Sequence, residues 1–192
     1  MQVFLPLVAS PDQLATSSIM KFILKFGSKS LVVYDALLSE KKILMAGSLD
    51  YSISNIIEFD FATASLISPP LFGVQTKVYP YAQLSQITHL MQEKSYVAGV
   101  TSPMFIQNKG CYDLLCQVDV GKLLVPKNAD LPYEKEAYYK VDQDFINSLV
   151  FRIRQNSIND ADLRMAFSSY TRLMLDTLLW ETLPHSNKMV VI

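Results

Sequence analysis

The stretch from Ser17 to Ala46 constrains the fold of this chain more than any other. Apolar residues follow helical spacing from Ser17 to Phe26, and Gly27 stands where a helix would end. A second helix is expected from Ser28 to Glu40, and the mostly apolar run Lys42–Ala46 that follows directly has the length of a buried strand. Helices joined tightly to a buried strand are typical of a layered α/β domain. We therefore predict an α/β fold.

The same alternation continues downstream. Tyr51–Ile67 has the spacing of a helix, which Pro69 and Pro70 should end, because proline restricts the preceding backbone and donates no hydrogen bond. The further elements expected, in chain order, are a strand at 78–81, a helix at 84–91, a strand at 96–100 and a β-rich segment at 112–125 with a turn near 119–122.

The composition changes after Val125. The segment 126–140 is polar and charged and contains Pro132, which favours a linker or surface loop. Two helices are expected beyond it, the first with Asp142 as N-cap and a hydrophobic staple between Val141 and Ile146. The last helix should run from 160 to 182 and end before Pro184. The predicted organisation is a strand or linker at 1–16, an α/β domain at 17–126, a linker at 127–140, a helical segment at 141–184 and a tail at 185–192.

Composition and charge exclude several classes of protein. Of the 192 residues, 50% are hydrophobic and 18% charged, which excludes a disordered polar chain. The net charge of −1 and the lack of a basic cluster argue against nucleic-acid binding. Cys111 and Cys116 are expected to be reduced and apolar in character, without a disulfide or zinc. No signal peptide or bilayer span is predicted, so we expect a soluble, cytoplasmic protein.

We find no pattern that requires a cofactor or a catalytic group. The six glycines form no phosphate-binding motif, and Ser48 is interpreted as a helix N-cap. Glu58 and Asp60 stand at i and i+2, which do not share a helix face, so they make no acid–base pair. A small α/β enzyme stays an alternative, and it would need a polar pocket containing His89 or Cys116.

Several motifs then occur in a fixed order. They are Tyr34–Leu44, Ser68–Leu71, Tyr79–Ala82, Tyr96–Phe105, Tyr112–Cys116 and Leu163–Thr171. In this order, over residues 17–182, they resemble the DENN family, and most of all its branch named for stabilisation of the polarity axis, with the Avl and Afi trafficking proteins. Ser102 stands where that family often has Asn, and Cys111 where it often has Trp.

The resemblance implies a central DENN-type α/β lobe with short buried strands and the helical start of a C-terminal lobe. It implies guanine-nucleotide exchange on a Rab-type small GTPase, without covalent chemistry or a cofactor, and membrane contact only through the GTPase. A typical member begins with a longin-like lobe, of which at most the final strand, Gln2–Val8, is expected here. The alternative is a non-catalytic scaffold that binds Arf- or Rab-type GTPases or polarity proteins.

Residues that contact a GTPase must be exposed and near the junction of the two lobes. The sequence alone establishes neither property, and we nominate Tyr34, Asp35, Glu40 and Lys41 as candidate contact residues, with Tyr79 and Tyr81 as secondary candidates. A core position for Tyr34, and a merely solvated helix end at Glu40 and Lys41, remain open alternatives.

Overall fold

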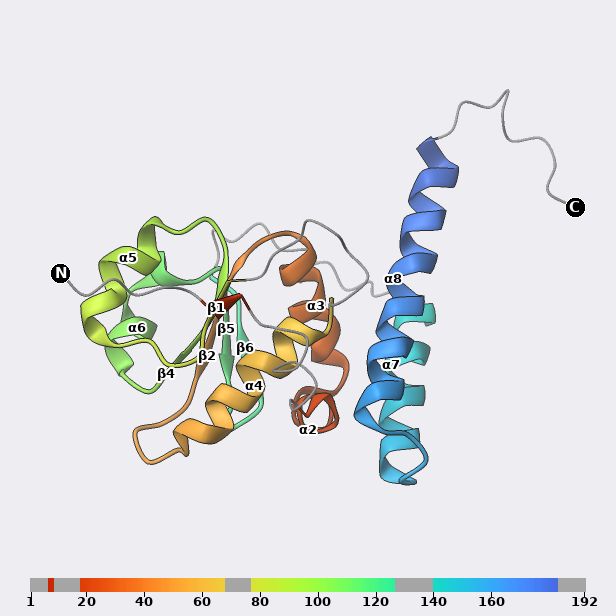
Figure 1. Ribbon diagram of the computed structural model, residues 1–192, viewed down its shortest axis with the longest axis horizontal. Helices are drawn as coiled ribbons and strands as arrows, with labels where there is room; N and C mark the ends of the chain where they lie inside the picture. Colours follow the sequence, from red (N-terminus) through yellow and green to blue (C-terminus); the bar gives the residue numbers. More distant parts are fainter. Residues whose placement is uncertain (1–6, 9–17, 68–76, 127–139, 183–192) are drawn as a thin grey trace, which may run out of the picture.

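The computed structural model describes residues 7–8, 18–67, 77–126 and 140–182 and has an α/β body with a helical pair beside it (Figure 1). The body contains one six-stranded sheet in the order β1-β3-β4-β2-β5-β6. Its strands are β1 (Leu7–Val8), β2 (Lys42–Ala46), β3 (Lys77–Tyr79), β4 (Tyr96–Val100), β5 (Leu114–Gln117) and β6 (Lys122–Leu124). The four inner strands are parallel, and β1 and β6 pair antiparallel at the two sides. The predicted mixed α/β class is confirmed.

Helices cover both faces of the sheet (Figure 1). One face carries α2 (Ile19–Phe26), α3 (Ser30–Leu38) and α4 (Ile53–Ser65), and the other carries α5 (Ile87–Gln92) and α6 (Pro103–Gln107). Short 3-10 turns precede or follow them at Gly27–Lys29, Leu84–Gln86 and Lys109–Cys111. The helices predicted at 28–40 and 84–91 thus each begin with a 3-10 turn.

Alternation along the buried strands divides the core into two layers. In β2, Ile43 and Met45 join the cluster under α2, α3 and α4, whereas Leu44 and Ala46 join the cluster under α5 and α6. All four side chains are buried. This explains why the strand is an unbroken apolar run in the sequence, since both faces of a parallel sheet are covered by helices.

The helical pair consists of α7 (Lys140–Arg154) and α8 (Asp160–Thr182), which lie side by side against α2 and α3 (Figure 1). The rings of Phe145 and Tyr170 stack with centroids 4.4 Å apart. The backbone N–H of Met20 donates to Asp160 Oδ1 at 2.8 Å, which ties the start of α2 to the start of α8. None of the described helices combines the length and the hydropathy that crossing a bilayer requires.

Two predicted N-caps are wrong. Helix α7 begins at Lys140, so Asp142 lies inside its first turn. An acidic side chain at this position interacts favourably with the helix dipole. The Asp142 carboxylate also accepts a 2.5 Å hydrogen bond from the Tyr170 hydroxyl. Helix α4 begins at Ile53, later than the N-cap expected at Ser48. The carbonyl of Ser48 instead accepts from the N–H of Tyr51 in the loop before α4. The predictions for Pro69–Pro70, the linker at 127–139 and Pro184 lie outside the described residues.

Candidate interaction site at the edges of the sheet

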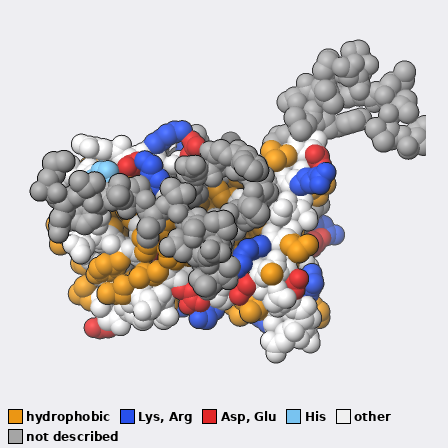
Figure 2. Space-filling model, viewed as in Figure 1, with side chains coloured by type: hydrophobic (Ala, Val, Ile, Leu, Met, Phe, Trp, Pro, Cys, Tyr) orange, Lys and Arg blue, Asp and Glu red, His pale blue; other side chains and the backbone are white. Residues whose placement is uncertain are grey.

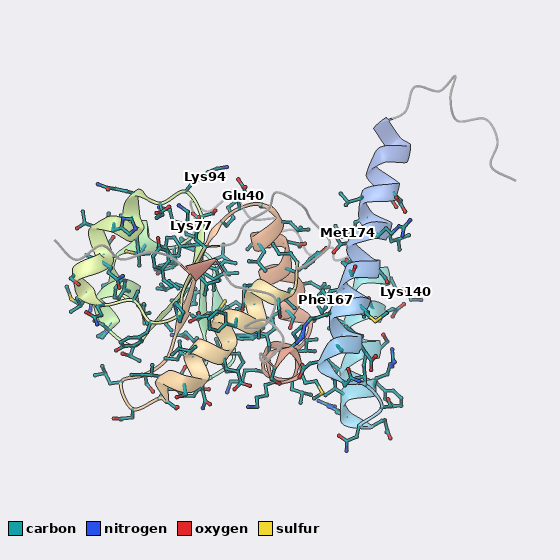
Figure 3. The ribbon with its side chains drawn as sticks, in the orientation of Figure 1. Glu40, Lys77, Lys94, Lys140, Phe167 and Met174 are labelled. Atoms are coloured by element: carbon teal, nitrogen blue, oxygen red, sulfur yellow. The ribbon has the colours of Figure 1, made fainter. Side chains whose placement is uncertain are left out.

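The nominated residue Tyr34 is a core residue, and its nomination is corrected. Its side chain is fully buried, and its hydroxyl forms a 2.5 Å hydrogen bond with Thr171 Oγ1 on α8. Its ring lies 5.6 Å from that of Phe167, and Figure 3 shows Phe167 on the side of α8 that faces α3. Burial raises the pKa of Tyr34, so the phenol stays protonated. Tyr34 therefore holds the helical pair against the body and has no surface for a partner.

Glu40 and Lys41 lie between the end of α3 and the start of β2, at the amino edge of the parallel strands, and Asp35 lies about one turn earlier, within α3. Asp35 and Lys41 are half-buried and Glu40 is exposed, with a left-handed backbone (φ 49°). Glu40 forms an ion pair with Lys94, which precedes β4 (Figure 3). Glu40 and Lys41 thus lie at this edge. The ion pair of Glu40 with Lys94 is exposed, and such pairs contribute little to stability.

Tyr79 is the last residue of β3, is buried, and belongs to a polar network. Its hydroxyl lies 3.1 Å from His89 Nε2 and donates to Glu93 Oε1 at 3.3 Å, while Lys77 Nζ lies 2.5 Å from Glu93 Oε2. Burial, together with the Glu93 carboxylate, raises the pKa of Tyr79 to about 12. The hydrogen bond from Lys77 lowers the pKa of Glu93. The network holds a protonated phenol between fixed partners and joins β3 to the turn before β4.

The pair of His89 and Cys116 considered for nucleophilic chemistry is not assembled. His89 lies on α5 and contacts Tyr79, whereas Cys116 is fully buried under the helices of the opposite face. Burial raises the pKa of the Cys116 thiol, which disfavours the reactive thiolate. Both cysteines are free and buried. Within the described ranges, no group of three or more His, Cys, Asp or Glu residues could hold a metal ion.

Tyr81 lies at the other, carboxyl edge of the parallel strands. There the chain leaves β2 toward α4 on one face of the sheet, and leaves the neighbouring β4 toward α6 on the other face. In open α/β sheets such a reversal of connection leaves a crevice where ligands bind. A cleft of about 340 Å³ lies here, between the loops that follow β2, β4 and β5. Its lining residues are Ala46, Gly47, Ser48, Leu49, Thr101, Pro103, Ile106, Gln117 and Asp119.

Backbone hydrogen bonds hold these loops together. The N–H of Gly47 donates to the Val100 carbonyl at 3.0 Å, and the N–H of Val118 donates to the Ala46 carbonyl at 2.9 Å. A side chain at Gly47 would meet the ring of Tyr51 at 2.9 Å, so glycine is needed for the close packing of that ring. The cleft therefore has a fixed floor built from three segments that are distant in sequence.

Four exposed apolar side chains lie on the segments that follow β2, β3 and β4 at this edge, and we refer to Leu49, Ile53, Tyr81 and Met104 as the apolar rim. Leu49 also lines the cleft, and Met104 follows the lining residue Pro103. Leu49 is 74% exposed, Met104 52% and Tyr81 38%. The Tyr81 hydroxyl lies 3.0 Å from Oγ1 of Thr101, which connects the rim to the cleft lining. Figure 2 shows hydrophobic side chains gathered at the lower left of the molecule, near the loop from β2 to α4. Of the six nominees, only Tyr81 belongs to this surface.

Asp60 is an ionisable residue whose burial was not predicted from the sequence. It is fully buried on α4, and neither carboxylate oxygen has a hydrogen-bond partner among the described residues. Burial raises its pKa well above the ordinary value, which favours the neutral acid. Glu58 instead faces outward to Lys21 at 2.9 Å, so the prediction that these two acids do not share a face is confirmed. The signal that could have located Asp60 is its spacing of four from Ile56 and Ala64 on the buried side of the helix.

The comparisons with known proteins agree with one part of the sequence interpretation. The profile of a family described as "Stabilization of polarity axis" matches residues 16–127. An AFI1-like protein from Schizosaccharomyces pombe (strain 972 / ATCC 24843) is 31% identical over 100 residues. That match covers 50% of this chain but only 16% of the fission-yeast protein.

Proposed function

Because this chain belongs to the stabilization of polarity axis family, we propose that it is a DENN-type regulator of small GTPases in cell polarity or membrane trafficking. The family description supports the role in polarity. The order of the motifs from Tyr34 to Thr171 and the layered α/β body support the DENN type. The proposed partner is a GTPase of the Rab or Arf type, through which the chain would reach membranes from the cytoplasm.

The apolar rim is the observation that best supports a protein-binding role. Single exposed apolar residues are normal on protein surfaces, but a group around one cleft is typical of an interaction site. Tyr and Met, both present in the rim, are enriched in protein interfaces. We therefore favour the carboxyl edge with Tyr81 as the surface that meets the GTPase, and keep Asp35, Glu40 and Lys41 at the opposite edge as secondary candidates.

Regulation of this kind needs no covalent step and no cofactor. An exchange factor binds the nucleotide-free GTPase more tightly than the loaded one, and by linkage it weakens nucleotide binding by the same factor. Contacts that keep the switch segments from closing on phosphate and Mg²⁺ would produce this difference. The DENN resemblance implies that a longin-like lobe and the central lobe grip the GTPase jointly. We therefore expect the isolated chain to bind weakly and to exchange nucleotide slowly.

Release of fluorescent GDP from a panel of Rab and Arf GTPases tests the proposal. We expect slow acceleration of release for at least one panel member. Leu49→Asp should weaken binding of that GTPase at least about tenfold, because it places a charge in the rim. Leu173→Asp is the matched control, since Leu173 is 59% exposed on α8, away from the cleft.

Three outcomes would count against parts of this proposal. Binding without any acceleration of release would favour the non-catalytic scaffold. Rapid release by the isolated chain would contradict the joint grip with a second lobe. Equal loss of binding in both leucine variants would remove the rim as the contact surface.

A further inference from the structure

The cleft at the carboxyl edge has two chemically different parts. Leu49, Pro103 and Ile106 provide apolar walls, while Ser48, Thr101, Gln117 and Asp119 provide polar groups. Among the described residues that line the cleft, Asp119 has the only charged side chain. At about 340 Å³ the cleft lies at the small end of the roughly 300–1,000 Å³ that ligand pockets occupy. It therefore suits one long side chain better than an extended ligand.

Asp119 is held in place by its surroundings. Lys25 Nζ donates to the Asp119 carbonyl at 2.6 Å, and Asp119 Oδ1 accepts from the N–H of Val120 at 2.9 Å. Gly121 has a left-handed backbone (φ 66°), and a Cβ there would lie 2.7 Å from the Lys25 carbonyl oxygen. The turn that carries Asp119 is thus packed directly against the end of α2. Its carboxylate is presented in a fixed place and not on a loosely attached loop.

The side chains that match both parts of the lining are those of lysine and arginine. Each combines an aliphatic stem, which can lie on apolar walls, with a cationic head that needs anionic and polar acceptors. An anionic group would meet the negative charge of Asp119. A purely apolar side chain would cover Asp119 and Gln117 without supplying hydrogen bonds, and leaving buried polar groups unpaired is unfavourable.

We propose that the cleft binds one lysine or arginine side chain presented by a protein partner, with Asp119 pairing with the cation and Leu49, Pro103 and Ile106 covering the stem. The apolar rim would then contact the residues that flank this side chain in the partner. The inference rests on the proposed protein-binding function, and it adds the chemistry by which that surface selects a partner.

Titration of the isotope-labelled chain with two small probes, followed by NMR, tests this inference without any GTPase. The probes are N-acetyl-arginine methylamide and the uncharged N-acetyl-norleucine methylamide. We expect the arginine probe to shift the amide signals of Gly47, Thr101 and Gln117, with a Kd on the order of 1 mM. Asp119→Asn should weaken that binding about tenfold, because it removes the charge and keeps an oxygen for the Val120 N–H.

Asp50→Asn is the matched control, because Asp50 is an exposed carboxylate in the loop after β2 that does not line the cleft. It should leave binding of the arginine probe unchanged. The inference is overturned if the arginine probe leaves the cleft signals unshifted, if the norleucine probe binds equally well, or if both asparagine variants behave alike. Any of these results would overturn only the cation-binding inference. The proposed GTPase regulation would still be tested separately by the GDP-release assay.

Discussion

Replacing Gly99 with alanine should destabilise the protein through a clash at the centre of the sheet. A Cβ at this position would lie 2.3 Å from Asp60 Oδ2, 2.6 Å from Ile56 Cγ2 and 2.6 Å from the Pro80 carbonyl oxygen. The loop with Pro80 is tethered, because the N–H of Ala82 donates to the Gly99 carbonyl at 2.8 Å. Three neighbours, one of them backbone, would have to move together.

The magnitude follows from two opposing contributions. Overpacking a core costs about 1–3 kcal/mol of unfolding free energy, and we take the upper end because a tethered carbonyl is among the neighbours of Gly99. Alanine restricts the unfolded chain more than glycine does, which offsets about 0.4–1 kcal/mol. The expected net loss is therefore about 2 kcal/mol.

Urea unfolding followed by circular dichroism measures this loss. Gly110→Ala is the control, since a Cβ there would meet only the end of the flexible Met91 side chain, at 3.1 Å, and Asn108 Oδ1, at 3.4 Å, among its close neighbours. That variant should stay within about 0.5 kcal/mol of the native protein. The Gly99 substitution should also be less damaging in an Asp60→Ala background, which removes the nearest atom. Equal stability of the two alanine variants would refute the reasoning.

Three further predictions concern single contacts. Burial raises the pKa of Asp60, so its contribution to stability is complete below the unfolded pKa and falls as pH rises toward the folded pKa. Between those two pKa values the native protein should lose about 1.4 kcal/mol of unfolding free energy per pH unit relative to Asp60→Asn, and parallel stability–pH curves of the two proteins would contradict this. Tyr34→Phe should lower the unfolding free energy by about 1 kcal/mol through loss of the bond to Thr171, and a Thr171→Val background should abolish the difference, as chemical denaturation of the four proteins would show. Glu40→Gln should change stability by less than about 1 kcal/mol, because its ion pair with Lys94 is exposed, and a larger loss would mean that the pair is shielded from solvent.

The elements that depend on local periodicity were predictable from the sequence. β2 and β4 begin and end as predicted, because buried parallel strands form uninterrupted apolar runs. Helix α8 also matches its predicted bounds. Helix starts were less predictable, since capping depends on tertiary partners. Asp142 lies inside the first turn of α7, and its carboxylate accepts a hydrogen bond from Tyr170, 28 residues away.

The interaction site could not be read from local pattern in the same way. Tyr34 was nominated as a contact residue with a core position left open, and its hydrogen bond to Thr171, which shows the core position, joins residues 137 positions apart in the chain. The cleft depends on the strand order, which brings the ends of β2, β4 and β5 together. Small or polar residues within two positions of the end of each of these strands, such as Ser48, Thr101 and Asp119, were the available signal. They become a site only once the strands are placed side by side.

The central claim is that this chain acts by binding one state of a small GTPase more tightly than another. The affinity of the chain for a single Rab or Arf GTPase, measured in its nucleotide-free and its GDP-loaded forms, tests that claim most directly. The account predicts tighter binding of the nucleotide-free form, by the same factor by which the chain weakens GDP binding. Equal affinity for the two forms would contradict it.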